Sequence, residues 1–323
     1  WRPAKSGAEK FHGALLPHIG VENSRIWREV SALGNELQEL GPLAQSRVVA
    51  DVGILVDWQS WWALEQDSKP STSVTFYDRL ATFYGPFYAA NLTTDFVFTD
   101  SDFANYKLLV IPNLYLVDDA TVAKIEVYVA AGGTVVIGFF SGIVDANEHI
   151  RLGGYPAPFR KLLGLRVEEF APMAEGESNG VQFSDSTTAA CDLWADVIDL
   201  EGATALATFT GNFFAGQPAI TEHNFGQGRA YYIGTRLAAQ AMGALLGRIC
   251  HAAGVTPPVS APPGVEVVRR RTADGRDLWF VLNHRPELAT VTLPVTGIDV
   301  LRGVTASGVV ALAPFDVAII QSE

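Results

Sequence analysis

The sequence predicts a protein of the α/β class, in which an open, mostly parallel sheet with helices on both faces is followed by a small antiparallel β-sandwich. Three observations carry this prediction. Continuous apolar runs, typical of fully buried strands, alternate with helical patterns over residues 49–140. A stretch with four prolines at 256–264 is typical of an extended linker. The residues after it form short strand patterns without a helix. With 323 residues, the chain is long enough for two or three domains.

The first long element is expected to be a helix over 24–40. Ser24 is a suitable N-cap, and Gly41-Pro42 ends the helical pattern. Apolar side chains at helical spacing are expected to form its buried face: Ile26, Trp27, Val30, Leu33, Leu37 and Leu40.

Strands and helices are then expected to alternate. The predicted strands are 49–57, 95–99, 107–114 and 134–140, and the predicted helices are 74–92 and 118–133. Helix 118–133 has acidic residues at its start and glycines at its end, as capping favours. This βαβ order implies a parallel sheet.

The pattern changes after residue 141. Residues 142–155 form a long, charged, Gly-rich loop. Beyond it, alternating polar and apolar residues predict short antiparallel strands, and 237–254 predicts a helix that closes this part of the chain. After the proline-rich linker, Asp274-Gly275 lies between two strand patterns and indicates a hairpin.

Composition excludes several classes of function. Lys and Arg number 23 and Asp and Glu 35, and the resulting net charge of −12 argues against a nucleic-acid partner. No apolar run reaches the ~20 residues that a bilayer span needs, so no membrane partner is expected. Cys191 and Cys250 cannot build a disulfide framework and favour a reducing, cytoplasmic location. Residue 1 is Trp1, so we expect the natural N-terminus to be missing and the chain to be a piece of a larger protein.

Motifs for cofactors and metals are missing where they would be needed. No GxGxxG follows the strand at 49–57, and GxxxxGK[ST] occurs nowhere. The turn after this strand holds Trp58, Trp61 and Trp62, whose bulk leaves no close backbone approach for a phosphate. Neither HExxH nor paired CxxC is present. We therefore expect no cofactor and no metal.

A flavodoxin-like sheet of the class I glutamine amidotransferase kind is a further interpretation. A Cys–His hydrolase on such a sheet needs a cysteine on the sharp turn after a central strand. The corresponding turn, Gly138–Ser141, has no cysteine, and Cys250 lies in an apolar helix. The sequence therefore fits the fold but lacks the nucleophile.

Two groups of residues are candidates for function. Long, charged, Gly-rich loops are often functional, and the loop at 142–155 supplies Asp145, Glu148, His149 and Arg151. These residues would line the rim of a site, contact another subunit or hold the loop by internal ion pairs.

The second group is the cluster of Trp58, Trp61 and Trp62. Three roles stay open for it: stacking on a sugar, anchoring an interface, or packing a helix on the sheet.

Several stretches resemble the C-terminal half of the β-galactosidases of glycoside hydrolase family 42. WRPAKSGAEKFHGALLPH resembles the end of that family's barrel, where W-R-x(n)-G-x-E-x-x-H follows the last strand. VGILVDWQSWWALE, GGTVVIGFFSGIVDANEHIRLGGYPAPFRKLLGL and GQGRAYYIGTRL resemble successive parts of its trimerisation domain. VEVVRRR and LWFVLNH resemble its small C-terminal β-domain. The similarity extends over nearly the whole chain in a consistent order.

This resemblance implies a domain organisation. Residues 1–40 would be the C-terminal remnant of a (β/α)8 barrel, 41–258 an α/β trimerisation domain of amidotransferase-like fold, and 259–323 a small all-β domain. It also implies that the parent enzyme is a homotrimer that hydrolyses terminal β-D-galactosides with retention.

Of the family's site residues, the resemblance assigns only two to positions in this sequence. The family's two catalytic glutamates lie on barrel strands upstream of the W-R motif, so no catalytic residue is expected here. Glu9 and His12 match G-x-E-x-x-H and would bind galactose hydroxyls when the barrel is present. We therefore expect a non-catalytic portion of a retaining β-galactosidase that serves trimerisation and active-site support. The alternative is an independent carbohydrate-binding module that uses the Trp58–Trp62 cluster.

Overall fold

The computed structural model describes residues 6–11, 18 and 24–322. The chain divides into two compact units. One unit is continuous, Ala50–Pro258, and the other combines Trp1–Val49 with Val259–Glu323. We describe each unit by itself.

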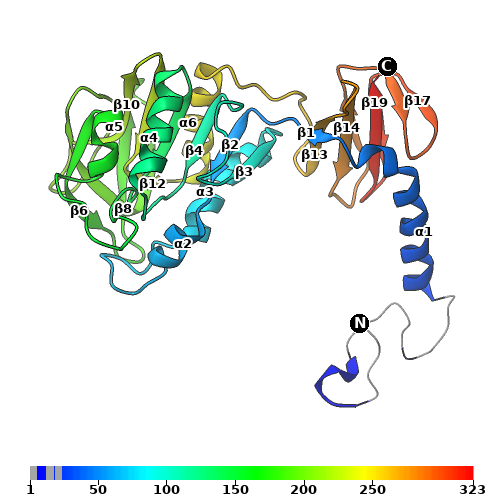
Figure 1. Ribbon diagram of the computed structural model, residues 1–323, viewed down its shortest axis with the longest axis horizontal. Coiled ribbons are helices and arrows are strands. Elements are labelled where there is room, and N and C mark those ends of the chain that lie inside the picture. Colours follow the sequence, from blue (N-terminus) through cyan, green and yellow to red (C-terminus); the bar gives the residue numbers. More distant parts are fainter. Residues whose placement is uncertain (1–5, 12–17, 19–23, 323) are drawn as a thin grey trace. The chain divides into compact units, whose positions relative to one another are not determined.

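The unit Ala50–Pro258 is built around one 11-stranded sheet, in the order β12-β8-β7-β9-β10-β11-β5-β4-β2-β3 with β6 paired to β8 (Figure 1). Its parallel strands are β2 (Val52–Leu55), β3 (Thr94–Val97), β4 (Leu108–Ile111), β5 (Thr134–Gly138) and β11 (Gly228–Ile233). Every residue of β2, β4 and β5 is buried, as the continuous apolar runs predicted.

The remaining strands of this sheet pair antiparallel. They are β6 (Leu165–Pro172), β7 (Ser178–Phe183), β8 (Thr188–Leu200), β9 (Thr204–Phe209), β10 (Pro218–Phe225) and β12 (Thr235–Leu237). Strand β11 joins the two halves, because it is parallel to β5 and antiparallel to β10. A tight connection opposes Phe225 to Gly228 and so fixes the β10–β11 pair as antiparallel. The sheet is therefore mixed, and the expectation of a mostly parallel sheet holds only for its first half.

Helices cover both faces of this sheet. They are α2 (Trp58–Leu64), α3 (Phe76–Ala89), α4 (Asp119–Ala130), α5 (Arg160–Leu163) and α6 (Ala239–Ala252), with a 3₁₀ turn η3 (Ala157–Phe159). Asp57, Thr75 and Asp118 begin α2, α3 and α4 as N-caps whose side chains accept a backbone N–H. Apolar residues of α4 and α5 belong to one core cluster, whereas Phe83 of α3 packs with Leu245 of α6 in a second.

The second unit contains a six-stranded antiparallel sheet in the order β1-β13-β14-β19-β16-β17. Its strands are β1 (Arg47–Val48), β13 (Val265–Arg271), β14 (Asp277–Asn283), β16 (Gly297–Asp299), β17 (Val304–Ala306) and β19 (Val317–Ser322), and β15 (Ala289–Thr292) pairs separately with β18 (Val309–Leu312). The predicted hairpin at Asp274-Gly275 is confirmed, since Arg271 opposes Asp277 and Gly275 has a φ of +90°.

This unit also contains a helix, α1 (Arg25–Glu39), flanked by the 3₁₀ turns η1 (Ala8–Phe11) and η2 (Gly41–Leu43). Ser24 is the predicted N-cap and accepts the Trp27 N–H at 3.2 Å. The apolar face that the spacing predicts is exposed in this chain, since Leu33 and Leu37 are 52% and 58% exposed, as we expect for a face that a complete barrel would cover. The described part of the chain supplies no element that covers that face.

Candidate interaction site at the carboxyl ends of the parallel strands

Both groups of candidate residues lie at the carboxyl ends of the parallel strands, where open α/β sheets usually bind ligands. Asp57 follows β2 and begins α2, which carries the three tryptophans. The loop at 142–155 begins just after β5. Leu116, which follows β4, donates its N–H to Ser60 of α2 at 3.2 Å and forms a bridge with Val144 of the loop. The fold therefore brings together two segments that are far apart in sequence.

The turn after β5 is buried and fixed by hydrogen bonds. Phe140 has a left-handed backbone, with a φ of 58°. The Asn113 side-chain amide donates to the carbonyls of Phe139 and Phe140, at 3.1 Å each. The Ser141 hydroxyl donates to the carbonyl of Gly138 at 2.8 Å. A hydrolase elbow would carry its nucleophile here, but Phe140 is buried and unreactive.

The two cysteines do not replace that nucleophile. Both Cys191 and Cys250 are buried and unpaired. Burial raises the pKa of the Cys250 thiol to about 11, so the thiolate is scarce at neutral pH.

Behind the turn lies a buried polar network that the sequence analysis did not predict. The Trp194 indole donates to one Asp196 oxygen and the Tyr232 hydroxyl to the other, both at 2.7 Å. Burial raises the pKa of Asp196 to about 7, and the two hydrogen bonds only partly oppose this shift. The Phe139 ring stacks on Trp194 at 5.5 Å between centroids. The network therefore holds the turn from inside the unit.

The tryptophans divide into one packed and two exposed rings. Trp61 is stacked between Trp58, at 5.3 Å, and Phe76, at 4.8 Å between centroids. Trp61 is thus partly buried and packed on two aromatic rings, so it is less accessible to a sugar than an exposed ring. Trp58 and Trp62 are 50% and 66% exposed and remain available for contact.

Most charged side chains of the loop form hydrogen bonds within the loop or with the start of α4. Asp145 accepts the backbone N–H groups of Asn147 and His149, and these hydrogen bonds lower the pKa of its carboxyl group. Arg151 donates to Asp119 at 2.7 Å. Glu148 accepts a hydrogen bond of 3.5 Å from Gln66, just beyond α2. Among the candidates of this loop, Glu148 and His149 are the exposed ones, and Glu148 also contacts the segment that follows α2.

The predicted galactose-binding pair lies in the other unit. Glu9 is exposed within η1, and His12 lies outside the described residues.

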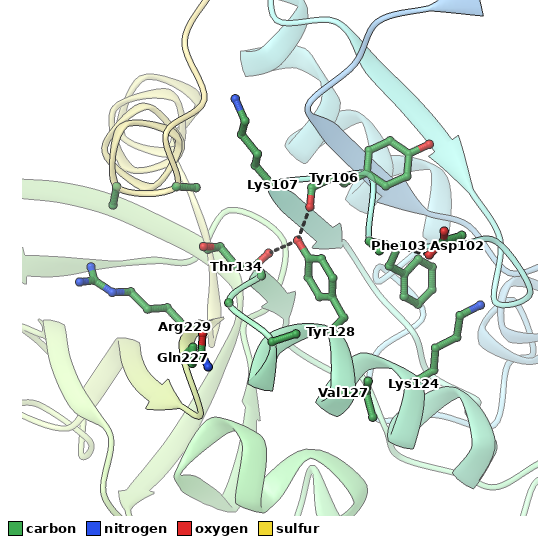
Figure 2. Close-up of a pocket in the computed structure, with 17 residues that line it drawn as sticks. Asp102, Phe103, Tyr106, Lys107, Lys124, Val127, Tyr128, Thr134, Gln227 and Arg229 are labelled. Carbon is green, nitrogen blue, oxygen red and sulfur yellow. Dashed lines mark hydrogen bonds between the residues drawn. The ribbon is translucent and has the colours of Figure 1, made fainter.

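A pocket of about 670 Å³ lies at the opposite, amino ends of β4, β5 and β11 (Figure 2). The Tyr128 hydroxyl donates there to the carbonyls of Tyr106 and Thr134. The pocket's cations are already paired: Lys107 with Asp51 at 2.9 Å, Lys124 with the Thr99 carbonyl at 2.9 Å, and Arg229 with Glu222 at 3.2 Å. The charges of Lys107 and Arg229 are thus balanced by carboxylates, whereas Lys124 is held by an uncharged carbonyl and keeps its charge.

The residues that the structure describes hold no group of three or more His, Cys, Asp or Glu side chains placed to bind a metal ion. No helix among them is long and apolar enough to cross a membrane.

Comparison with family models gives three consecutive matches. Residues 50–256 match the β-galactosidase trimerisation domain, 264–322 the β-galactosidase C-terminal domain, and 1–40 a model described as β-galactosidase.

Relatives with known names agree with these matches. The chain is 43% identical to the β-galactosidase LacZ of Heyndrickxia coagulans over 99% of its own length and 48% of the relative. It is 41% identical to BgaB of a Geobacillus strain over 91% of its length and 44% of that relative. The chain thus spans about half the length of the curated relatives it matches.

Solved structures give the same result. The β-galactosidase of Bacillus circulans sp. alkalophilus superposes with a TM-score of 0.95 at 33% identity, over 99% of this chain and 48% of that one. A catalytic mutant of Gan42B, a family 42 β-galactosidase from G. stearothermophilus, gives 0.93 at 30% identity, over 100% and 47%. These similarities do not favour an independent carbohydrate-binding module.

Proposed function

We propose that this chain, which belongs to the β-galactosidases of glycoside hydrolase family 42, forms the non-catalytic C-terminal portion of such an enzyme and serves its assembly and the support of its active site. The order of the three family matches carries the proposal. Residues 50–256 match the trimerisation domain and residues 264–322 the C-terminal domain, while only residues 1–40 match the remaining model.

In the whole protein, we infer hydrolysis of terminal β-D-galactosides with retention. That reaction needs two carboxylates about 5–5.5 Å apart on a rigid scaffold. Our proposal places both upstream of this chain and gives Glu9 and His12 the binding of sugar hydroxyls. The match of residues 1–40 supports this assignment. The reaction as proposed needs no cofactor, and the galactoside would bind only with the barrel present.

The finer fold assignment is a flavodoxin-like sheet of the class I amidotransferase type. Renumbered along the chain, the parallel strands β3-β2-β4-β5-β11 have the order 2-1-3-4-5, which is the flavodoxin order. The left-handed backbone of Phe140 supports an elbow of the amidotransferase kind without its nucleophile. We retain the division into 1–40, 41–258 and 259–323 as the proposed domain organisation.

Assembly as a homotrimer and a cytoplasmic location complete the proposal. The match to a trimerisation domain supports self-association. Two buried, unpaired cysteines suit a reducing compartment. The exposed Trp58 and Trp62, together with Glu148 and His149, are the proposed interface or site-rim residues, and Asp145 and Arg151 shape the loop that carries two of them.

A chimera tests the proposal directly. The C-terminal half of the H. coagulans relative would be replaced by this chain, and hydrolysis of o-nitrophenyl β-galactoside would be measured. We expect turnover by the chimera, and none by this chain alone or by the relative's N-terminal half alone. Turnover by the purified chain would overturn its non-catalytic assignment, and an inactive, folded chimera would overturn the supporting role.

A further inference from the structure

We propose that copies of this chain contact one another through the outer face of α3 and the adjoining edge strand β3. We name this surface the α3–β3 face. It consists of Tyr77, Ala81, Tyr84 and Tyr88 on α3, Phe96 on β3 and Phe98 just after it. The inference rests on the proposed function, because it assigns a place in the fold to the self-association proposed there.

The aromatic side chains of this face form a continuous strip. Positions 77, 81, 84 and 88 are spaced four, three and four residues apart, which places them on one side of the helix. Tyr84 lies 6.1 Å from Tyr88 and 5.8 Å from Phe96 between ring centroids, so the strip passes from the helix to the strand. Tyr77 and Phe96 are 71% and 50% exposed.

The outer surface of α3 carries no available charge. Its 14 residues include only two charged side chains, Asp78 and Arg79. Arg79 is completely buried, and Asp78 pairs with Arg236 at 3.1 Å. Helices that face water normally present charged residues on that side. A helix with tyrosines and alanines there is instead typical of a covered surface.

The strand next to this helix is an open edge. β3 is the last strand of the large sheet and pairs with β2 alone among the strands of the described chain (Figure 1). Exposed edges are usually protected by free charges, prolines or bulges. The one carboxylate on β3, Asp95, accepts the Tyr106 hydroxyl at 3.0 Å, and the exposed side chain beside it is Phe96. An edge built in this way needs a covering partner.

A second copy of the chain fits this surface better than other occupants. Residues 50–256, which include all of α3 and β3, match a trimerisation domain. A net charge of −12 makes two copies repel each other, so a contact between them favours the part of the surface that lacks free charge. The α3–β3 face has this property. A closed three-fold ring also requires each copy to use two different patches, and this face would supply one of them.

The test compares molar masses by light scattering after size exclusion. We expect the chain to give a mass near three times 34.8 kDa. Ala81→Arg, and independently Phe96→Lys, should reduce the mass to that of one chain at the same concentration. The matched control is Val127→Arg on α4, a side chain that is 69% exposed and outside the face. Unchanged circular dichroism and melting midpoints would show that all three variants fold.

Two results would overturn the proposal. Retention of the full mass by both Ala81→Arg and Phe96→Lys would exclude the face from the contact. A single-chain mass for the unaltered protein would show that copies of this chain do not associate through the face. Neither result affects the assay of catalysis by the isolated chain, whose outcome alone decides the non-catalytic assignment, so the two proposals fail separately.

Discussion

The guanidinium carbon of Arg79 lies 4.1 Å from the centroid of the Phe139 ring, in the interior of the unit Ala50–Pro258. Arg79 is completely buried, and its three side-chain nitrogens have no hydrogen-bond partner among the described residues. Burial lowers the pKa of Arg79 to about 9, because the charged form loses its hydration. The ring contact and the attraction of the nearby Asp78 and Asp192 carboxylates are the compensation that the structure shows for this charge.

We predict that Arg79→Met leaves the free energy of unfolding within about 1 kcal/mol of the unaltered protein or raises it. Methionine is an unbranched side chain of similar length and removes a buried charge that makes no hydrogen bond among the described residues, a change that is often neutral or stabilising. Arg79→Ala is the control and should cost several kcal/mol, roughly 2–5, through the cavity it leaves. Urea unfolding measures both. A large loss for Arg79→Met would show that the guanidinium has a strong partner, such as enclosed water.

Asp196 should make stability depend on pH. The pKa of its carboxyl group is raised to about 7 in the folded chain, against about 3.9 in the unfolded one. Between these values the folded state keeps a proton that the unfolded state has released. The free energy of unfolding therefore falls as pH rises from about 4 to about 7 and then levels off.

The variant Asp196→Asn should lose this dependence while keeping a polar group for Trp194 and Tyr232. We expect the drop in unfolding free energy between pH 5 and pH 8 to be smaller in the variant by on the order of 2–3 kcal/mol. Denaturant titrations at both pH values measure the difference, and other titrating groups cancel in the comparison. An equal drop in unfolding free energy in both proteins would show that Asp196 is not the group that causes the pH dependence.

At position 140, a glycine variant should be more stable than an alanine variant, which reverses the usual order of stability. The φ of 58° at Phe140 strains any residue with a Cβ atom. Both Phe140→Ala and Phe140→Gly lose the ring's packing against Trp194 and Tyr115, at 4.9 and 5.1 Å, and should cost roughly 3–5 kcal/mol. The glycine variant should nevertheless be more stable than the alanine variant by about 1 kcal/mol. Thermal unfolding ranks the pair, and the ordinary order would argue against a left-handed backbone here.

Gly228, at the start of β11, should not tolerate a side chain. A Cβ atom there would lie 2.1 Å from the Gly133 carbonyl oxygen and 2.2 Å from that of Val129. These are backbone atoms, so Gly228→Ala should cost at least about 2 kcal/mol, in the range of overpacked cores. Gly247→Ala is the matched control, because a Cβ within α6 meets nothing within 4 Å. It should add about 0.5–1 kcal/mol. Equal melting midpoints for Gly228→Ala and Gly247→Ala would contradict the expected difference between a crowded and an open position.

The sequence predicted the parallel strands and the long helices well because their signals are local. Strands β2, β4 and β5 lie within continuous apolar runs. The cap at Ser24 came from residue type alone. The mixed character of the sheet depends on β11 pairing with both β5 and β10, and pairing between distant strands leaves no local trace.

The candidate site was predicted as two groups of residues but not as one place. Gln66 and Glu148 are 82 residues apart and meet only in the fold. The buried network could not be predicted either, because Trp194 and Asp196 lie on β8 and Tyr232 on β11, and these residues match no motif. A completely buried arginine contradicts the ordinary preference of that residue type for the surface, so composition could not suggest it.

The short strand β1 gives the chain the organisation of one domain inserted into another. Arg47 and Val48 pair with β13 before the chain enters the unit Ala50–Pro258. Within that unit, Lys107 donates to Asp51 at 2.9 Å and to the Gly254 carbonyl at 3.2 Å, so one side chain spans its two ends. Ends this close can be joined by a short loop. The unit is therefore a suitable scaffold for circular permutation, in which new termini are opened at an exposed turn while every strand of its sheet keeps its neighbours.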